Sequence, residues 1–75
     1  MKQITIYDLL PLLRNGWVAM DEDSGWWWFE KKPRIEDNEW WNAAGILIGL
    51  YRFNIAPFDG DWKDSLIKVE HKEEE

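Results

Sequence analysis

The chain has 75 residues, with nine Lys or Arg side chains against fifteen Asp or Glu side chains and a net charge of −6. This length predicts one small domain, and no apolar run approaches the roughly eighteen residues of a membrane-spanning helix, so we expect no membrane partner. Without cysteine there is no disulfide framework and no thiolate site for structural zinc. The first residues lead directly into sequence typical of a fold, with no signal peptide, which predicts a cytoplasmic protein.

Acidic charge is unevenly placed along the chain. Residues 70–75 carry four acids and one base, which predicts a disordered tail after a single compact domain over residues 1–69. The one cationic cluster, around Pro33, is too short for the basic stripe that binds duplex nucleic acid through its phosphates. Duplex nucleic acid is therefore not an expected partner.

A short helix is predicted near the N-terminus. Residues 5–8 have the form of a capping box, and Ile4 and Leu9 have the spacing of a hydrophobic staple. Pro11 removes a helical hydrogen bond, so we expect a helix that is either kinked or starts one turn later. Asn15-Gly16 is typical of a left-handed helix end.

Strand signals follow the helix. The apolar residues 17–20 and the segment 26–31, which opens with four aromatic residues, flank a polar turn, and this pattern predicts a β-hairpin. The second strand opens with four consecutive aromatic residues, whose side chains alternate between the two faces of a sheet. One short helix covers only one face, so something else must cover the second pair of rings.

Two further segments complete the predicted fold. Residues 40–53 are read as a strand, with a helix over 42–50 as the alternative. Residues 62–69 are expected to begin as a helical turn capped by Asp61 and to finish as an edge strand. The fold class predicted is α+β, with one short N-terminal helix packed on a small, mainly antiparallel sheet of three to four strands.

The sequence gives little support for catalysis or metal binding. His71, the single histidine, lies in the charged tail, so no serine has a histidine close in sequence. The oxygen-rich turns at 21–25 and 59–61 lack the spacing of a calcium-binding loop. We therefore expect no enzyme, no metal site and no cofactor.

Outward-facing aromatic rings are the best candidate for a binding site. With Trp26 and Trp28 as the outward pair, Trp41 on a neighbouring strand and Arg34 and Arg52 nearby, the chain would present a stacking platform with a cationic edge. Such a platform suits a nucleobase and its phosphate, and it also suits a protein partner. A third interpretation is a seam between copies of the chain, and we expect a homo-oligomer.

Three acidic clusters favour a different partner. They lie at residues 21–23, 36–39 and 59–64. An acidic surface steers association toward a basic nucleic-acid channel. A host defence protein such as a CRISPR effector or a nuclease is therefore the alternative target, and plain solubility of turns is the interpretation without function.

Residues 6–19 are similar to the opening of small accessory proteins of bacteriophages and prophages, in which an L-x-x-L-x-x-G helix precedes a W-V-A strand. Asp61-Trp62 followed by the apolar residues 66–69 adds to this likeness. The chain resembles the second Thoeris anti-defence family of phage sponges, small oligomers that sequester a cyclic ADP-ribose-type immune signal. The resemblance implies a phage-encoded antagonist that binds a nucleotide signal without catalysis in the infected bacterial cell. It transfers no binding residue, since Ala19-Met20-Asp21 stands where that family has an arginine.

Overall fold

The N-terminal helix α1 spans Ile6–Leu9 in a computed structural model that describes residues 3–42 and 44–71. The predicted capping box is present: the Asp8 N–H donates to the Thr5 hydroxyl, and the Asp8 carboxylate accepts from the Thr5 N–H at 2.9 Å. The helix continues as a 3-10 turn, η1, over Leu10–Leu12, and Pro11 stands in the first part of that turn, where its missing N–H is not needed. In the described residues no helix has the length and apolar character to cross a membrane.

Gly16 has a packing role, and the predicted left-handed helix end at Asn15-Gly16 is wrong. The chain leaves η1 through the extended residue Leu13, and Gly16 is the first residue of strand β1. A Cβ atom on Gly16 would lie 2.6 Å from the Phe29 carbonyl oxygen and 2.8 Å from the Trp28 ring. Glycine therefore allows the indole to pass close to the backbone of β1.

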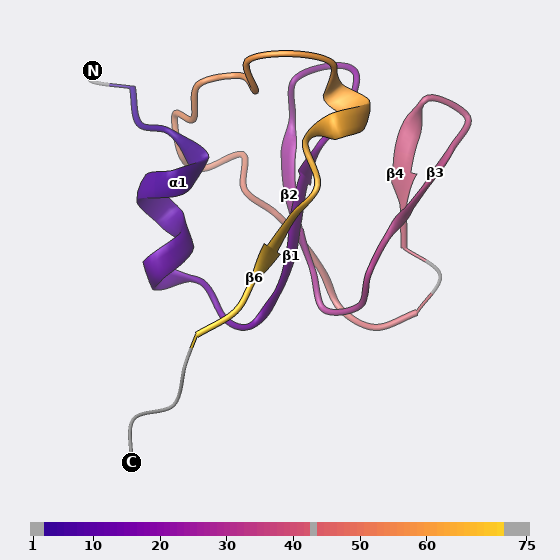
Figure 1. Ribbon diagram of the computed structural model, residues 1–75, viewed down its shortest axis with the longest axis horizontal. Coiled ribbons are helices and arrows are strands. Elements are labelled where there is room, and N and C mark those ends of the chain that lie inside the picture. The colour runs from indigo at the N-terminus through magenta and orange to yellow at the C-terminus, as the bar shows by residue number, and fades with distance from the viewer. Residues whose placement is uncertain (1–2, 43, 72–75) are drawn as a thin grey trace.

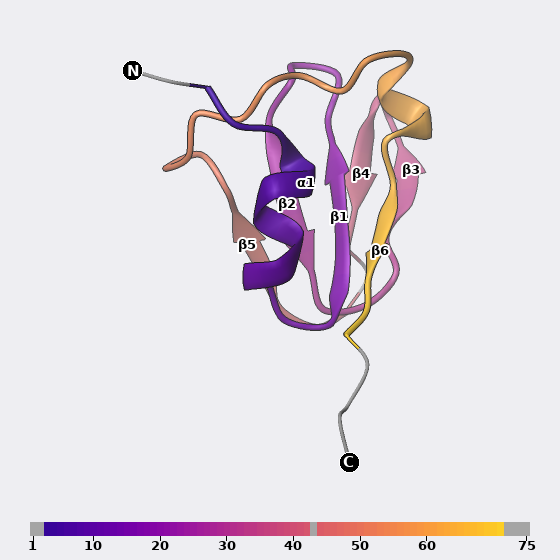
Figure 2. The ribbon, with the colours of Figure 1, turned by 60° about the vertical axis from the view of Figure 1, so that its left-hand side comes forward.

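The main sheet has four strands in the order β5-β2-β1-β6, and every neighbouring pair is antiparallel (Figure 2). Its strands are β1 (Gly16–Met20), β2 (Trp26–Phe29), β5 (Leu47–Gly49) and β6 (Ile67–Val69). The predicted hairpin is confirmed, with Val18 opposite Trp28. The last element also agrees with the prediction: a 3-10 turn, η2 (Trp62–Asp64), is capped by the Asp61 side chain and precedes the edge strand β6.

A second hairpin divides the strand predicted over residues 40–53. Strand β4 (Glu39–Trp41) pairs with β3 (Arg34–Glu36), while Leu47–Gly49 joins the main sheet as β5. Asp37 and Asn38 connect β3 to β4 with φ angles of 51° and 66°, the conformation that a two-residue turn between twisted strands requires. The alternative of a helix over 42–50 is wrong.

The molecule has three layers, with α1 on one face of the main sheet and the β3–β4 hairpin on the other (Figure 1). The core between α1 and the sheet consists of eight buried apolar side chains: Ile6, Leu9, Val18, Met20, Trp26, Trp28, Leu50 and Val69. On the hairpin side, Ala19 and Phe29 are also buried. The predicted α+β class, with one short helix on a mainly antiparallel sheet, is confirmed.

The predicted tail over residues 70–75 falls mostly on residues 72–75, which lie outside the described residues. Its second residue, His71, donates its backbone N–H to the Asn15 side-chain oxygen at 2.9 Å. The His71 ring also contacts the Leu13 carbonyl oxygen. These contacts fix the chain after β6 against the segment that follows η1.

Candidate functional site

The predicted stacking platform is not assembled in the structure. Trp26 and Trp28 lie beneath α1 with 4% and 5% of their surface exposed, so the expectation that they face outward is wrong. The physical reason is that they share a sheet face with Val18 and Met20, and the apolar side of α1 packs on that face. Their indole N–H groups donate to backbone carbonyl oxygens of residues 56 and 14, both at 3.1 Å.

The other three predicted site residues lie in two places. Trp41 is 40% exposed on β4, and the Arg34 guanidinium lies 5.0 Å from its ring centroid. Arg34 also pairs with Glu36 at 2.8 Å. Arg52 is exposed in the turn after β5, and within the described residues it makes no ion pair or cation–π contact. The structure therefore brings Trp41 and Arg34 together and leaves Arg52 apart.

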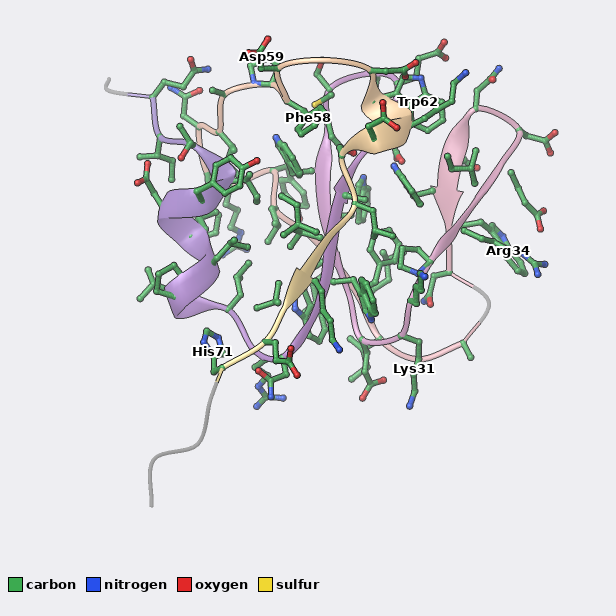
Figure 3. All side chains as sticks on the ribbon, viewed as in Figure 1. Lys31, Arg34, Phe58, Asp59, Trp62 and His71 are labelled. Carbon is green, nitrogen blue, oxygen red and sulfur yellow. The ribbon has the colours of Figure 1, made fainter. Side chains whose placement is uncertain are left out.

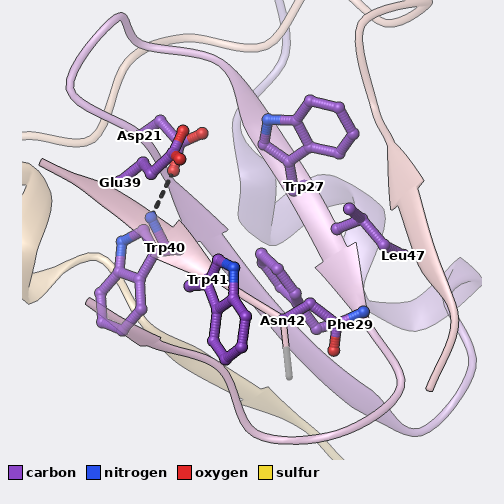
Figure 4. A pocket seen from close by; sticks show the side chains of 8 residues that line it. All are labelled: Asp21, Trp27, Phe29, Glu39, Trp40, Trp41, Asn42 and Leu47. Carbon is purple, nitrogen blue, oxygen red and sulfur yellow. Dashed lines mark hydrogen bonds between the residues drawn. The ribbon is translucent and has the colours of Figure 1, made fainter. Parts of the chain in front are cut away.

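A groove of about 320 Å³ lies between the β3–β4 hairpin and the face of the main sheet opposite α1 (Figure 4). We call it the tryptophan groove. Its lining comes from the strands β2, β4 and β5 and from residues directly after β1 and β4. It combines apolar rings with acidic and amide groups: Asp21, Trp27, Phe29, Glu39, Trp40, Trp41, Asn42 and Leu47.

The floor of the tryptophan groove follows from strand alternation. Trp27 and Phe29 are two residues apart on β2, so their side chains share the face that α1 does not cover. Leu47 on β5 is the register partner of Phe29 and lies on the same face. Phe29 is buried, whereas Trp27 and Leu47 keep exposed surface. The floor is thus apolar and open at the side of β5.

The opposite wall is held in place by Trp40. Its backbone N–H donates to the Asp21 carboxylate at 2.9 Å, and its ring N–H donates to the Trp62 carbonyl oxygen at 3.4 Å. The two indoles of Trp40 and Trp62 also pack edge to face, with centroids 6.5 Å apart. These contacts fix β4, and Trp41 next to Trp40 keeps a large exposed ring surface.

Two carboxylates, Asp21 and Glu39, line the groove. Burial raises the pKa of Asp21, the hydrogen bond from the Trp40 N–H lowers it, and the negative charges of Asp23 and Glu39 raise it further, so that the pKa stands above its ordinary 3.8. The ionised Asp21 carboxylate is therefore in an unfavourable place by itself. A cation bound beside it would offset both the dehydration and the repulsion.

Asn42 contributes an acceptor that has no partner. Its side-chain N–H donates to the Gly45 carbonyl oxygen at 3.1 Å, and its Oδ1 atom is buried without a hydrogen bond to any described residue. Buried polar atoms in folded proteins are nearly always hydrogen-bonded. This oxygen is enclosed by the protein, so a molecule in the groove reaches it only if the Asn42 side chain moves.

An acidic hollow of about 330 Å³ adjoins the groove and shares Asp21 and Glu39 with it. Turns of both hairpins form it, through Asp21, Glu22, Asp23, Asp37, Asn38 and Glu39. Two of the three acidic clusters seen in the sequence thus meet at one place. Figure 3 shows Asp59 of the third cluster near this end of the molecule, and Lys31 and His71 at the opposite end. Among the described residues no group of His, Cys, Asp or Glu side chains has the arrangement of a metal site.

Chemically, the tryptophan groove is built to attract a cation that also has donor groups. Indole faces and carboxylates both interact favourably with an ammonium or guanidinium group. No Lys or Arg side chain is among the lining residues. A phosphate in the groove would meet the carboxylates of Asp21 and Glu39, while the Arg34 guanidinium over Trp41 is already paired with Glu36, so the groove disfavours anionic ligands.

Sequence reasoning missed Trp27 and Asn42 as site residues. Strand alternation separated Trp27 and Phe29 from the other pair of rings, but it could not tell which pair faces the helix. Asp21 and Glu39 were noticed as parts of acidic clusters, and nothing in the sequence joined those clusters to the rings. No sequence signal identified Asn42, because its role depends on how β4 passes the main sheet.

Comparisons with known proteins found no match to any family model, to any curated protein or to any solved structure. The resemblance to phage sponges therefore stands on residues 6–19 and 61–69 alone. The chemistry of the tryptophan groove must carry the functional conclusion.

Proposed function

We propose that this protein is a non-catalytic antagonist of bacterial immunity that holds a basic segment of a host defence protein in its tryptophan groove. The observation that carries the proposal is the composition of the groove, which combines exposed indole surface with the carboxylates of Asp21 and Glu39. The phage origin and the setting inside an infected bacterial cell come from the resemblance of residues 6–19. The composition of the groove indicates the class of partner, a basic segment.

A lysine or arginine side chain of a partner would gain from each component of this groove. A cation over an indole face contributes about 0.5–2 kcal/mol, depending on how completely water is removed. Hydrogen bonds to charged groups contribute about 1.5–3 kcal/mol each. A cation beside Asp21 would also remove the penalty that burial and neighbouring acids place on its charge. Several modest gains at one place make an anchor residue.

The charge of the whole chain supports a basic partner. With a net charge of −6 and acidic turns next to the groove, the protein would steer toward positively charged surfaces and away from phosphates. Proteins that handle nucleic acid carry such surfaces in the channel that holds the phosphate backbone. A CRISPR effector or a nuclease is therefore the target that we propose, blocked by occupation of its channel.

Sequestration of a nucleotide immune signal is the second candidate. The contact that favours it is the Arg34 guanidinium over the Trp41 ring, at 5.0 Å, since a base could stack there beside a cation. Arg34 is engaged by Glu36, and the predicted partners Trp26 and Trp28 are buried. This candidate therefore has one ring and one cation where the expected platform had three rings and two cations.

A peptide-binding experiment with matched charge variants tests the proposal. The probe is a short peptide rich in arginine and lysine, titrated by calorimetry at low salt. Glu39→Gln in the groove should weaken binding by about tenfold, which corresponds to about 1.4 kcal/mol. Glu70→Gln changes the net charge equally at the other end of the chain and should change affinity less than twofold. Equal effects of the two variants would show a general charge attraction and contradict the groove.

Cyclic nucleotides and ADP-ribose cyclic isomers serve as the second set of probes. Binding of such a nucleotide that is abolished by Arg34→Ala and unaffected by Glu39→Gln would support the sponge and overturn the proposal. The basic-segment proposal expects no nucleotide binding, and a normal peptide affinity in the Arg34→Ala variant.

A further inference from the structure

Exposed apolar side chains gather on β5 and on the turn that follows it. Among the described residues nine large apolar side chains are exposed, and five of them lie within residues 46–53: Ile46, Leu47, Ile48, Tyr51 and Phe53. Strand β5 lies at one edge of the main sheet, and β6 lies at the other (Figure 2). The β6 edge carries the charged pair Lys68 and Glu70, 3.8 Å apart, which is a usual protection against edge-to-edge pairing. Strand β5 itself carries no charged side chain.

The backbone of β5 has hydrogen-bonding groups available at this edge. The Ile46 carbonyl oxygen accepts from residue 30, and the Leu50 N–H donates to residue 26, so even-numbered residues direct their backbone groups toward β2. In an antiparallel ladder the alternate residues direct theirs the other way. The N–H and C=O groups of Leu47 and Gly49 therefore face the free edge.

The distribution of charge indicates which partner pairs with the β5 edge. Residues 42–51 form a run of ten residues without a charged side chain, in a chain whose net charge is −6. Two copies of an acidic chain repel each other least where neither carries charge. A basic partner would instead be drawn to the acidic turns at the hairpin side. The uncharged apolar edge thus fits a second copy of this chain better than it fits a charged partner.

We propose that β5 pairs with β5 of a second copy, antiparallel and around a two-fold axis that passes between the two Ile48 residues. This register uses all four free backbone groups, because Leu47 of each copy exchanges two hydrogen bonds with Gly49 of the other. Ile48 then faces Ile48 as a non-hydrogen-bonded pair, with Cα atoms about 4.5 Å apart. The two four-stranded sheets become one sheet of eight strands.

The dimer has a consequence for binding. A two-fold axis perpendicular to a sheet keeps equivalent faces on the same side. Leu47 lines the tryptophan groove and belongs to the pairing strand, so both grooves would open on one surface, on either side of the axis. Two basic segments of one partner could then bind together, which raises the effective affinity. The dimer itself does not rest on the proposed function.

A cysteine cross-link tests the pairing directly, since the chain has no cysteine of its own. In the Ile48→Cys variant the two thiols should form a disulfide in mild oxidant, because a Cα separation of about 4.5 Å lies within the range of disulfides. Leu12→Cys is the control: Leu12 is 80% exposed on η1, outside the strands of the sheet, so it takes no part in the proposed register. We expect most of the Ile48→Cys chains, and few of the Leu12→Cys chains, to run as dimers on a non-reducing gel.

Light scattering of the unmodified chain and of Ile48→Lys completes the test. The unmodified chain should show twice the monomer mass, and the lysine pair at the axis should halve it. Tryptophan fluorescence and one-site peptide binding should stay unchanged and show that the variant is folded. A monomeric unmodified chain, a dimer that survives Ile48→Lys, or equal cross-linking of the two cysteine variants would overturn the pairing. Peptide binding that fails while the dimer persists would instead count against the groove.

Discussion

The two faces of the main sheet use tryptophan differently. On the α1 side, Trp26 and Trp28 are buried, and both indole N–H groups donate to backbone oxygens. On the hairpin side, Trp27 and Trp41 keep exposed surface around an open groove. Consecutive residues of one strand thus serve stability on one face and leave apolar surface available on the other. A cluster of tryptophans in a sequence does not by itself distinguish these roles.

The completeness of the covering layer explains the difference. The apolar side of α1 fills the space over its face, so the core there is closed. The β3–β4 hairpin is held at one end by the Trp40 N–H bond to Asp21, and it leaves a gap in front of Trp27. Substitutions of tryptophan on the two faces should therefore lower the free energy of unfolding by different amounts.

Trp28→Ala should have the largest effect on stability. Removal of this buried ring leaves a cavity and an unpaired carbonyl oxygen at Arg14, and such changes cost about 3–5 kcal/mol. Because small domains have a total stability of about 5–15 kcal/mol, much of the protein should unfold in moderate urea. Trp27→Ala, the matched change one residue away, should cost less than half as much. Equal shifts of the urea midpoint would contradict the distinction between a closed and an open face.

Ser65→Ala should have the next largest effect. Ser65 is fully buried, and its hydroxyl accepts from the Met20 N–H at 2.8 Å and donates to the Trp62 carbonyl oxygen at 2.6 Å. Loss of the hydroxyl leaves a buried donor unpaired, which costs about 1–3 kcal/mol. Faster hydrogen exchange of the Met20 amide should accompany the loss. Asn54→Ala, at an exposed position, is the control and should leave both measurements nearly unchanged.

Much of the fold could be predicted from local signals. The capping box at Thr5, the first hairpin and the turn capped by Asp61 each depend on neighbouring residues, and all three are present. The division of residues 40–53 between two sheets could not be predicted, because it depends on pairing with distant strands. The prediction of a helix end at Gly16 was wrong for the same reason. A glycine is needed there because the Trp28 ring of the neighbouring strand passes close to the backbone.

The candidate site was less predictable than the fold. Strand alternation grouped the rings of residues 26–29 correctly into two pairs. The choice between the pairs depends on which face α1 covers, and this is decided by packing with Val18 and Met20. The meeting of Asp21 with Trp40 joins segments nineteen residues apart, through a backbone hydrogen bond that no motif encodes.

Asp21→Asn should have the smallest effect on stability, visible mainly through its pH dependence. The pKa of Asp21 is raised in the folded protein, chiefly by burial, so the folded state binds this proton more tightly than the unfolded chain does. The stabilisation that this tighter proton binding gives the folded state is complete below pH 3.8, and it is lost as the pH rises through the raised pKa of the folded protein. Asparagine keeps an acceptor for the Trp40 N–H and cannot ionise. The stability of the Asp21→Asn variant should therefore not fall through ionisation at this position as the pH rises.

The control for this titration is Glu22→Gln, which removes the same charge from an exposed neighbour. Urea unfolding between pH 3 and pH 7 provides the measurement. The stability of Asp21→Asn should improve relative to the unmodified chain as the pH rises. Two results would show that burial at the groove does not penalise the charge of Asp21. One is a difference in unfolding free energy between Asp21→Asn and the unmodified chain that stays constant from pH 3 to pH 7. The other is the same change of that difference with pH in Glu22→Gln.

Indole resonances in a ¹⁵N–¹H NMR spectrum test the central claim most directly. The chain has seven tryptophans and therefore seven side-chain N–H signals, which single Trp→Phe variants assign. Titration with the basic peptide should shift the signals of Trp27 and Trp41 strongly and those of the buried Trp26 and Trp28 little. A peptide that binds without moving Trp27 and Trp41, or that moves the two buried rings most, would contradict a tryptophan groove that holds a basic segment.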